Sequence, residues 1–212
     1  MITLIFRPCW QPLGRGCANG QPPTKPIQTQ PLLSQIVLYL IGYGNNNRSP
    51  CFHQKSKSGE LTSSCFSQWW ESPFTVDKVK FNTAEHWMMA QKAFLFNNKE
   101  IYDKIIRVKS PAEAKVLGRH VRDFDDTVWN AKRFDIVVKG NLEKFTQNKD
   151  LKEFLLNTKD RILVEASPVD RIWGIGLTAG SDKAENPNRW EGLNLLGFVL
   201  MEVRDIIRNR EG

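Results

Sequence analysis

A carboxylate and a lysine, seven residues apart, flank an apolar stripe in residues 82–94. The carboxylate is Glu85, which Trp87 follows closely, and the lysine is Lys92. This spacing equals two helical turns, so both side chains project from roughly the same face. A carboxylate beside tryptophan can act as a general base or stabilise positive charge. The alternative is structural, with Asn82 as the N-cap and Glu85 at the third position of a capping box.

A second carboxylate lies in residues 166–177, a charged loop with glycines that follows a predicted strand. Asp170 and Arg171 stand close to Trp173, and the glycines would let a ligand approach the backbone. Such a loop at the end of a strand is a common place for a site. The ordinary alternative is a turn with an Asp170–Arg171 surface pair and a core tryptophan.

A second polar loop, residues 186–194, precedes the last predicted helix. Its backbone amides, together with the guanidinium of Arg189, would suit a phosphate group. The alternative is a solvated loop in which Asn194 serves only as an N-cap.

Helices must position most of these groups, because helical patterns follow one another from residue 82 onward. Ser110, Pro111 and Glu113 form a strong start signal, with a capping serine, a proline at the first position and a glutamate at the third. Further helices are predicted at 98–108, from 125 or 126 to about 146, near 151–155 and at 195–208, with strands at 35–43 and 161–165 and a hairpin or bent strand at 75–81. The inward stripes are Phe134, Val138, Leu142 and Phe145 in the long helix, and Leu196, Val199, Leu200, Val203 and Ile207 in the last.

Composition favours one globular domain, preceded by an N-terminal segment of different composition. The chain has 212 residues, of which 41% are hydrophobic, enough for a real core. Residues 1–34 are predicted to be a disordered or loosely packed leader, and residues 35–212 to be the domain. Of the formal net charge of +7, residues 1–65 carry +5, which argues against a basic body that grips nucleic acid. Nucleic-acid binding through the leader stays open.

The four cysteines form no C-x-x-C pair, which favours free thiols in a reducing, cytoplasmic compartment. A zinc site built from Cys51, His53 and Cys65 would match no standard ligand spacing, so no metal site is predicted. No apolar run reaches the roughly 18 residues of a membrane span.

Taken together, the motifs resemble the NADAR family of YbiA-like proteins. The resemblance covers about residues 35–208, keeps the motif order and includes the run Glu85-His86-Trp87. The other matching residues are 65–70, 72–74, 88–90, 92–93, 110–115, 117–119, 129, 133, 140, 144–145, 147, 163–168, 170, 173–177, 190, 192, 194, 196–197 and 200–201.

The resemblance implies a single compact domain, mainly α with a small β-sheet. It also implies an N-glycosidase, a hydrolase that cleaves the bond joining ribose to a base or amine. Substrates of the family look like riboflavin-pathway intermediates with ribose 5-phosphate, or ADP-ribose on modified guanine in nucleic acid. The alternative is a non-catalytic module that binds ADP-ribose or a nucleotide. Neither a metal, another cofactor nor a protein partner is expected.

The resemblance also assigns roles to residues. Glu85 is expected to be the base or electrostatic stabiliser, and Asp170 its partner at ribose or water, because an oxocarbenium-like state needs a carboxylate near C1′. Whether Glu85 is ionised stays open, since the helix dipole favours ionisation and burial opposes it. The expected substrate contacts are Trp70, Lys92, Trp129, Lys132, Arg133, Trp173, Arg189 and Asn194.

Overall fold

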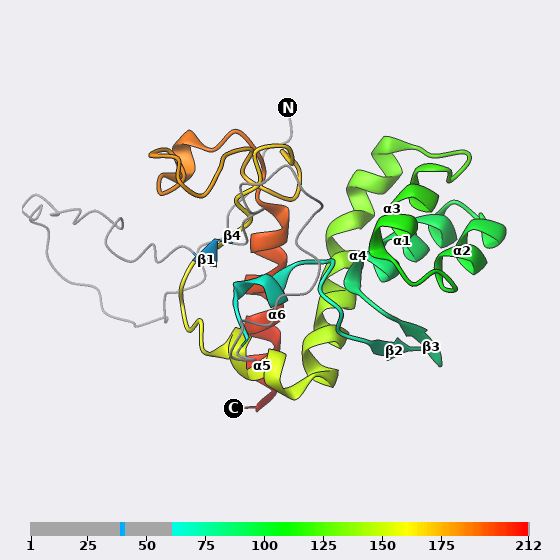
Figure 1. Ribbon diagram of the computed structural model, residues 1–212, viewed down its shortest axis with the longest axis horizontal. Coiled ribbons are helices and arrows are strands. Elements are labelled where there is room, and N and C mark those ends of the chain that lie inside the picture. The colour runs from blue at the N-terminus through cyan, green and yellow to red at the C-terminus, as the bar shows by residue number, and fades with distance from the viewer. Residues whose placement is uncertain (1–38, 41–60, 212) are drawn as a thin grey trace, which may run out of the picture. The chain divides into compact units, whose positions relative to one another are not determined.

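The computed structural model describes the backbone of Tyr39 and Leu40 and the whole of residues 61–211 (Figure 1). All of these residues belong to one unit, Leu32–Gly212. The predicted leader, residues 1–34, lies outside the described residues, as do Cys51 and His53 of the zinc alternative.

A tight hairpin leads into the first helix. Strand β2 (Phe74–Val76) pairs antiparallel with β3 (Val79–Phe81). The two connecting residues, Asp77 and Lys78, both have positive φ values of 48° and 67°. Two such residues are what a type I′ turn requires, and that turn follows the twist of the flanking strands. The hairpin predicted at residues 75–81 is confirmed.

A second pair of strands joins distant parts of the chain. Strand β1 (Tyr39–Leu40) lies parallel to β4 (Leu163–Val164). β4 falls within the strand predicted at 161–165, and β1 within the one predicted at 35–43. The described part of the chain thus holds two separate two-stranded sheets instead of one small sheet.

Helix α1 (Ala84–Leu95) begins one residue later than the capping-box prediction required. Its N-cap is Thr83, which has extended backbone angles and accepts a hydrogen bond from the backbone N–H of His86. Glu85 is therefore the second residue of the helix and not the third. The predicted capping box between Asn82 and Glu85 is wrong, because threonine is also a favoured N-cap residue and Thr83 stands at the last extended position.

The next two starts follow local sequence more closely. Helix α2 (Lys99–Ile105) lies inside the range predicted for it. Helix α3 (Pro111–Arg119) is capped by Ser110, and both hydrogen bonds of its capping box with Glu113 are present. The predicted start of α3 is confirmed, and it fixes which side chains of this helix face α1.

Helix α4 (Asp126–Gln147) starts at Asp125, whose side chain caps the N–H groups of Thr127 and Val128. Helix α5 (Lys149–Leu156) follows directly. Start and length agree with the prediction for the longest helix.

The inward stripe of α4 differs from the predicted one. Phe145 is fully buried, but Phe134, Val138 and Leu142 are only partly buried. Asn141 and Lys144 take the most enclosed positions, both 0% exposed. Both polar side chains form hydrogen bonds inside the protein in place of those with water. Lys144 Nζ donates to the carbonyls of Cys65 and Ser67, and the side chain of Asn141 pairs with that of Gln68.

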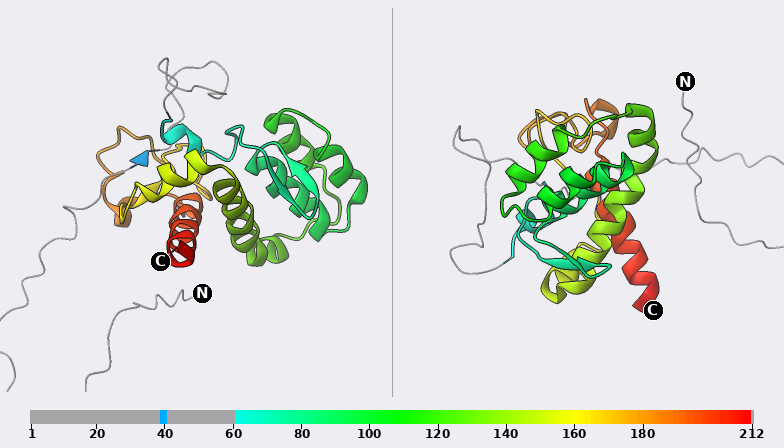
Figure 2. Two further views of the ribbon diagram at one scale, coloured as in Figure 1. Left: turned by 90° about the horizontal axis from the view of Figure 1, so that it is seen from below. Right: turned by 90° about the vertical axis from the view of Figure 1, so that its right-hand side faces the viewer.

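Helix α6 (Leu195–Glu211) closes the described chain and buries all five residues predicted to point inward. Helices α1, α2 and α3 pack together, and α1 also packs on α4 (Figure 1). α4 packs on α6, and the views of Figure 2 show α4 between α6 and the α1–α3 group. The predicted fold class, a mainly helical domain with little β-structure, is confirmed.

Candidate functional site

Glu85 lies inside the protein with one oxygen unused. The residue is 2% exposed, and its backbone N–H donates to the Gln68 carbonyl over 2.9 Å. Its side-chain atom Oε1 is buried and has no hydrogen-bond partner. The side chain of Trp69 hydrogen-bonds to the carboxyl group. Since indole can only donate, this bond favours the ionised form of Glu85.

Burial outweighs the positive charges around Glu85. Burial raises the pKa of Glu85 from 4.5 to about 7, and the nearby charge of Asp170 acts in the same direction. Lys115, the Trp69 hydrogen bond and Arg119 lower the pKa. Their combined effect is smaller than that of burial, so the pKa of the carboxyl group lies near neutral pH. A group with such a pKa can both accept and return a proton.

The carboxylate of Asp170 is held by two backbone N–H groups of its own loop. One carboxylate oxygen, Oδ1, accepts the backbone N–H groups of Ile172 at 2.9 Å and Trp173 at 2.8 Å. The expected surface pair with Arg171 does not form, because Arg171 contacts Glu191 at 3.2 Å. Asp170 is half-buried and its charge acts on Glu85, so the structure brings the two predicted catalytic carboxylates into one electrostatic neighbourhood.

A third carboxyl group belongs to this neighbourhood and was missed from sequence. Glu165 is 7% exposed, and its Oε2 atom is buried without a hydrogen-bond partner. Burial, and secondarily the charge of Asp170, raises the pKa of Glu165 to about 8. The hydroxyl of Ser167, two residues on, is also buried and unpartnered. The available signal was a glutamate at the end of a buried strand, directly before the candidate loop.

Two of the predicted phosphate-binding cations lie beside acids. Arg133 is half-buried near Asp126 and Asp170, and burial lowers its pKa. Lys92 places its ammonium 3.9 Å from the ring centroid of Phe124, and its pKa is lowered by burial against the charge of Asp126. Lys92 is not among the charges that act on Glu85. Although Glu85 and Lys92 share a face of α1, the Lys92 ammonium is therefore not part of the charged surroundings of Glu85.

Three further predicted contacts have other surroundings. Arg189, in the 3₁₀ helix η3 (Pro187–Arg189), pairs with Asp182 at 3.1 Å, and Lys132 is exposed on α4. Asn194 is fully buried, with its amide spent on the backbone of residues 163 and 165. The amide of Asn194 thus joins β4 to the start of α6, and its predicted substrate contact stays a prediction.

The three tryptophans predicted to contact substrate pack in or against the core, whereas Trp69 lies at the carboxyl group of Glu85. Trp69 reaches Glu85, whereas its neighbour Trp70 packs against the hydrophobic core. Trp129 is 9% exposed within the core cluster, and Trp173 packs against the same cluster with part of its surface free. The aromatic residue that contacts the catalytic candidate is thus Trp69, which was not among the predicted contacts.

His86 has a structural position beside Glu85. Its Nδ1 lies 2.8 Å from the Thr83 hydroxyl and its Nε2 lies 3.2 Å from the Val108 carbonyl, and burial lowers its pKa. A neutral imidazole that donates from Nε2 and accepts at Nδ1 satisfies both contacts. Within residues 61–211, no group of three or more His, Cys, Asp and Glu side chains is arranged to hold a metal ion.

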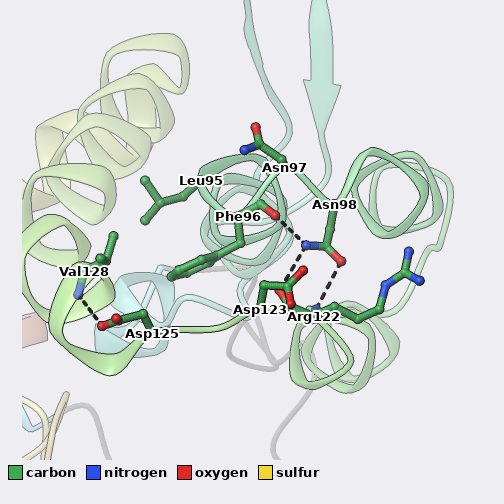
Figure 3. Close-up of a pocket in the computed structure, with 8 residues that line it drawn as sticks. All are labelled: Leu95, Phe96, Asn97, Asn98, Arg122, Asp123, Asp125 and Val128. Atoms are coloured by element: carbon green, nitrogen blue, oxygen red, sulfur yellow. Dashed lines mark hydrogen bonds between the residues drawn. The ribbon is translucent and has the colours of Figure 1, made fainter.

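A cavity of about 560 Å³ lies elsewhere, between the C-terminal end of α1 and the loop that leads into α4 (Figure 3). Two of its polar side chains, Asn98 and Asp125, already have hydrogen-bond partners. Asn98 donates to the carbonyls of Phe96 and Arg122, and Asp125 caps α4 (Figure 3). None of the predicted catalytic residues lines this cavity, so we place the site at Glu85 and not here.

The fold and site define a class of protein: a mainly helical domain with a buried carboxyl group suited to acid–base hydrolysis. Residues 51–208 match the model of the NADAR domain, so the chain belongs to the NADAR family, and the predicted resemblance is confirmed. None of the helices described in residues 61–211 combines the length and apolar character needed to cross a membrane.

Relatives agree with this assignment. N-glycosidase R617 of Acanthamoeba polyphaga mimivirus is 45% identical over 145 residues, which span 66% of this chain and 85% of that protein. The chloroplastic riboflavin biosynthesis protein PYRR of Zea mays is 33% identical over 138 residues, 62% of this chain and 20% of that protein. The NMR structure of Escherichia coli YbiA matches with a TM-score of 0.56 and 28% identity, covering 76% of this chain and 84% of that one. The names of the relatives support N-glycosidase activity in general, and the predicted enzyme class, a hydrolase of N-glycosyl bonds, is confirmed.

Proposed function

We propose that this chain hydrolyses the C–N bond between a phosphorylated ribose, free or within ADP-ribose, and a base or amine. The observation that supports this proposal is the state of Glu85. Its carboxyl group is buried with an unused oxygen and has a pKa of about 7, between the cations of α3 and the Asp170 loop. Strongly perturbed carboxyl groups with such neighbours are typical of catalytic positions.

The geometry suggests a role for each carboxyl group. Cleavage of an N-glycosidic bond passes through an oxocarbenium-like state at C1′. Ionised Glu85 accepts a proton from the attacking water as the water oxygen bonds to C1′ and the C1′–N bond breaks, and the protonated Glu85 then gives this proton to the departing nitrogen. Asp170, oriented by two backbone N–H groups, contacts the ribose or the water. Glu165 stays protonated at neutral pH, since its pKa is about 8, which limits negative charge in the site.

Two substrate groups follow from the family. The name of the maize relative supports intermediates of riboflavin biosynthesis that carry ribose 5-phosphate. The family resemblance adds ADP-ribose attached to guanine in nucleic acid. Both present the same bond, a ribose C1′ joined to nitrogen, with a phosphorylated 5′ carbon.

The test is an assay of the purified full chain with both substrate groups. Mass spectrometry of released ribose 5-phosphate and ADP-ribose gives the readout. We expect time-dependent release from at least one group. A folded protein that releases neither product would reject the proposal for these substrates.

The second candidate is a non-catalytic module for ADP-ribose or a nucleotide, which the unused polar atoms of Glu85, Glu165 and Ser167 would also serve. It predicts saturable binding of ADP-ribose without turnover. It also predicts that Glu85→Gln leaves this binding unchanged. A measurable rate in the wild-type chain excludes it.

A further inference from the structure

Helix α3 carries two cations near the candidate site, and neither is among the substrate contacts predicted from the sequence. Lys115 and Arg119 are four residues apart, so they lie on the same face of the helix. The charges of both act on the Glu85 carboxyl group and lower its pKa. The confirmed capping box at Ser110 fixes the start of α3 and hence the direction of this face.

Lys115 is tied to the carboxylate through an aromatic ring. Its ammonium lies 5.5 Å from the ring centroid of Trp69, whose side chain hydrogen-bonds to Glu85. The ammonium, the indole and the carboxyl group are therefore consecutive neighbours. Lys115 is half-buried and Arg119 is exposed, so the pair leads from the carboxyl group outward to solvent.

Neither cation is neutralised by an acid partner. Within residues 61–211, neither Lys115 nor Arg119 belongs to an ion pair. Of the cations predicted for this purpose, Arg189 pairs with Asp182, Lys92 covers the ring of Phe124 and Arg133 lies near Asp126 and Asp170. Lys132 is exposed on α4 and is not among the charges that act on Glu85.

If Glu85 served only as a counter-ion, it could neutralise at most one of the two positive charges of Lys115 and Arg119. Glu85 carries less than a full negative charge near neutral pH, since its pKa is about 7. The acids whose charges act on Arg133 are Asp126 and Asp170, whereas the cations whose charges act on Glu85 are Lys115 and Arg119. The excess positive charge suits an anionic ligand, and an arginine with a lysine is a common combination for phosphate oxygens.

We propose that Lys115 and Arg119 form the subsite for the phosphoryl group on the 5′ carbon of the substrate ribose and thereby hold C1′ against Glu85. This inference rests on the proposed function and specifies its substrate class. A phosphate monoester and the diphosphate of ADP-ribose share the chemistry that such a subsite recognises.

The test compares the double variant Lys115→Met/Arg119→Gln with wild type on phosphorylated substrate and on the same substrate after phosphatase treatment. We expect kcat/KM to fall at least tenfold further on the phosphorylated substrate, through a rise in KM, than on the dephosphorylated one, whose smaller loss reflects only the effect of the two charges on the Glu85 carboxyl group. The control is Lys99→Met/Lys104→Met, which removes two positive charges from exposed ion pairs of α2. Equal losses on both substrates would overturn the proposal, because the cations would then act only through Glu85.

Binding of ribose 5-phosphate and of ADP-ribose, measured by calorimetry, separates this inference from the proposed function. If the wild type binds ribose 5-phosphate but turns over neither substrate group, the subsite stands and the proposed reaction fails. The two ligands also show whether a monoester or a diphosphate is preferred. Arg119→Gln alone repeats the test without risk to folding, since Arg119 is exposed. Unchanged affinity for both ligands in the variants would overturn the subsite.

Discussion

The side chain of Trp69 donates a hydrogen bond to the carboxyl group of Glu85 in the interior of the domain. The bond joins the segment after the 3₁₀ helix η2 (Ser63–Phe66) to the first turn of α1. It favours the ionised form of a carboxyl group whose pKa burial has raised to about 7. The pair therefore sets the pH range in which Glu85 can serve as a base.

Replacing the indole should move this range. We expect Trp69→Phe to raise the pKa of Glu85, because the variant loses a hydrogen bond to the ionised form. The rise of kcat/KM with pH should then occur at higher pH, with a several-fold loss of activity at pH 6.5. The control, Trp190→Phe, removes an indole donor whose partner is the Ala184 carbonyl. An unshifted pH profile in Trp69→Phe would argue against the assigned hydrogen bond.

Glu165 should make the protein less stable as pH rises. Its pKa is 4.5 as a reference and about 8 in the fold, so between these values unfolding releases a proton. The free energy of unfolding therefore falls from pH 5 to pH 8, and Glu85 adds to the fall up to about pH 7. Glu165→Gln should show a flatter profile and a higher Tm than wild type at pH 8. Thermal unfolding at several pH values measures this, with Glu185→Gln, at an exposed glutamate, as the control. An equal pH dependence in both variants would contradict the prediction.

Lys144 should be essential for stability. Its ammonium donates to the carbonyls of Cys65 at 2.7 Å and Ser67 at 2.9 Å, from a fully buried position. We expect Lys144→Met to lower the free energy of unfolding by about 2–4 kcal/mol, because two buried carbonyls lose their donor. Lys132→Met, on the exposed face of the same helix, should change it by less than about 0.5 kcal/mol. Urea denaturation measures both, and equal effects would contradict the buried role.

Gly140 lies against a rigid side chain, and Gly118 lies against a flexible one. A Cβ atom at Gly140 would lie 2.1 Å from Trp87 Cδ1, and that ring is fixed by a 2.7 Å hydrogen bond to the Ile136 carbonyl. A Cβ atom at Gly118 would meet the flexible end of Met89 at the same distance. We expect Gly140→Ala to cost about 2–3 kcal/mol of stability. Gly118→Ala should cost clearly less, as chemical denaturation would show.

Local signals predicted the helices well. The capping box of Ser110, the cap of Asp125 and the apolar period of α6 each depend on residues within one or two turns, and each is confirmed. The start of α1 was wrong by one residue, since Asn82 and Thr83 are both good caps and the choice depends on backbone angles that sequence does not display.

The candidate site was less predictable, because its members are unusual for their residue types. Charged residues are normally exposed, so sequence gave no reason to bury Lys144 or Glu165. Lys144 is buried because carbonyls nearly eighty positions earlier in the chain accept its hydrogen bonds. Lys115 and Arg119 were not predicted as site residues, because their spacing is that of an ordinary helix surface and only the packing of α3 against α1 brings their charges near Glu85.

The most direct measurement is the pH dependence of kcat/KM for wild type and Glu85→Gln on a phosphorylated ribosylamine. For the wild type we expect activity to rise with pH through about 7, because the base must be ionised and Glu85 has that pKa. Glu85→Gln should fold, since it replaces a buried carboxyl group with a neutral group of the same size, but lose at least about 100-fold in kcat. Glu100→Gln, at an exposed ion pair, should keep wild-type rates. Full activity in Glu85→Gln would contradict the catalytic role of this carboxylate.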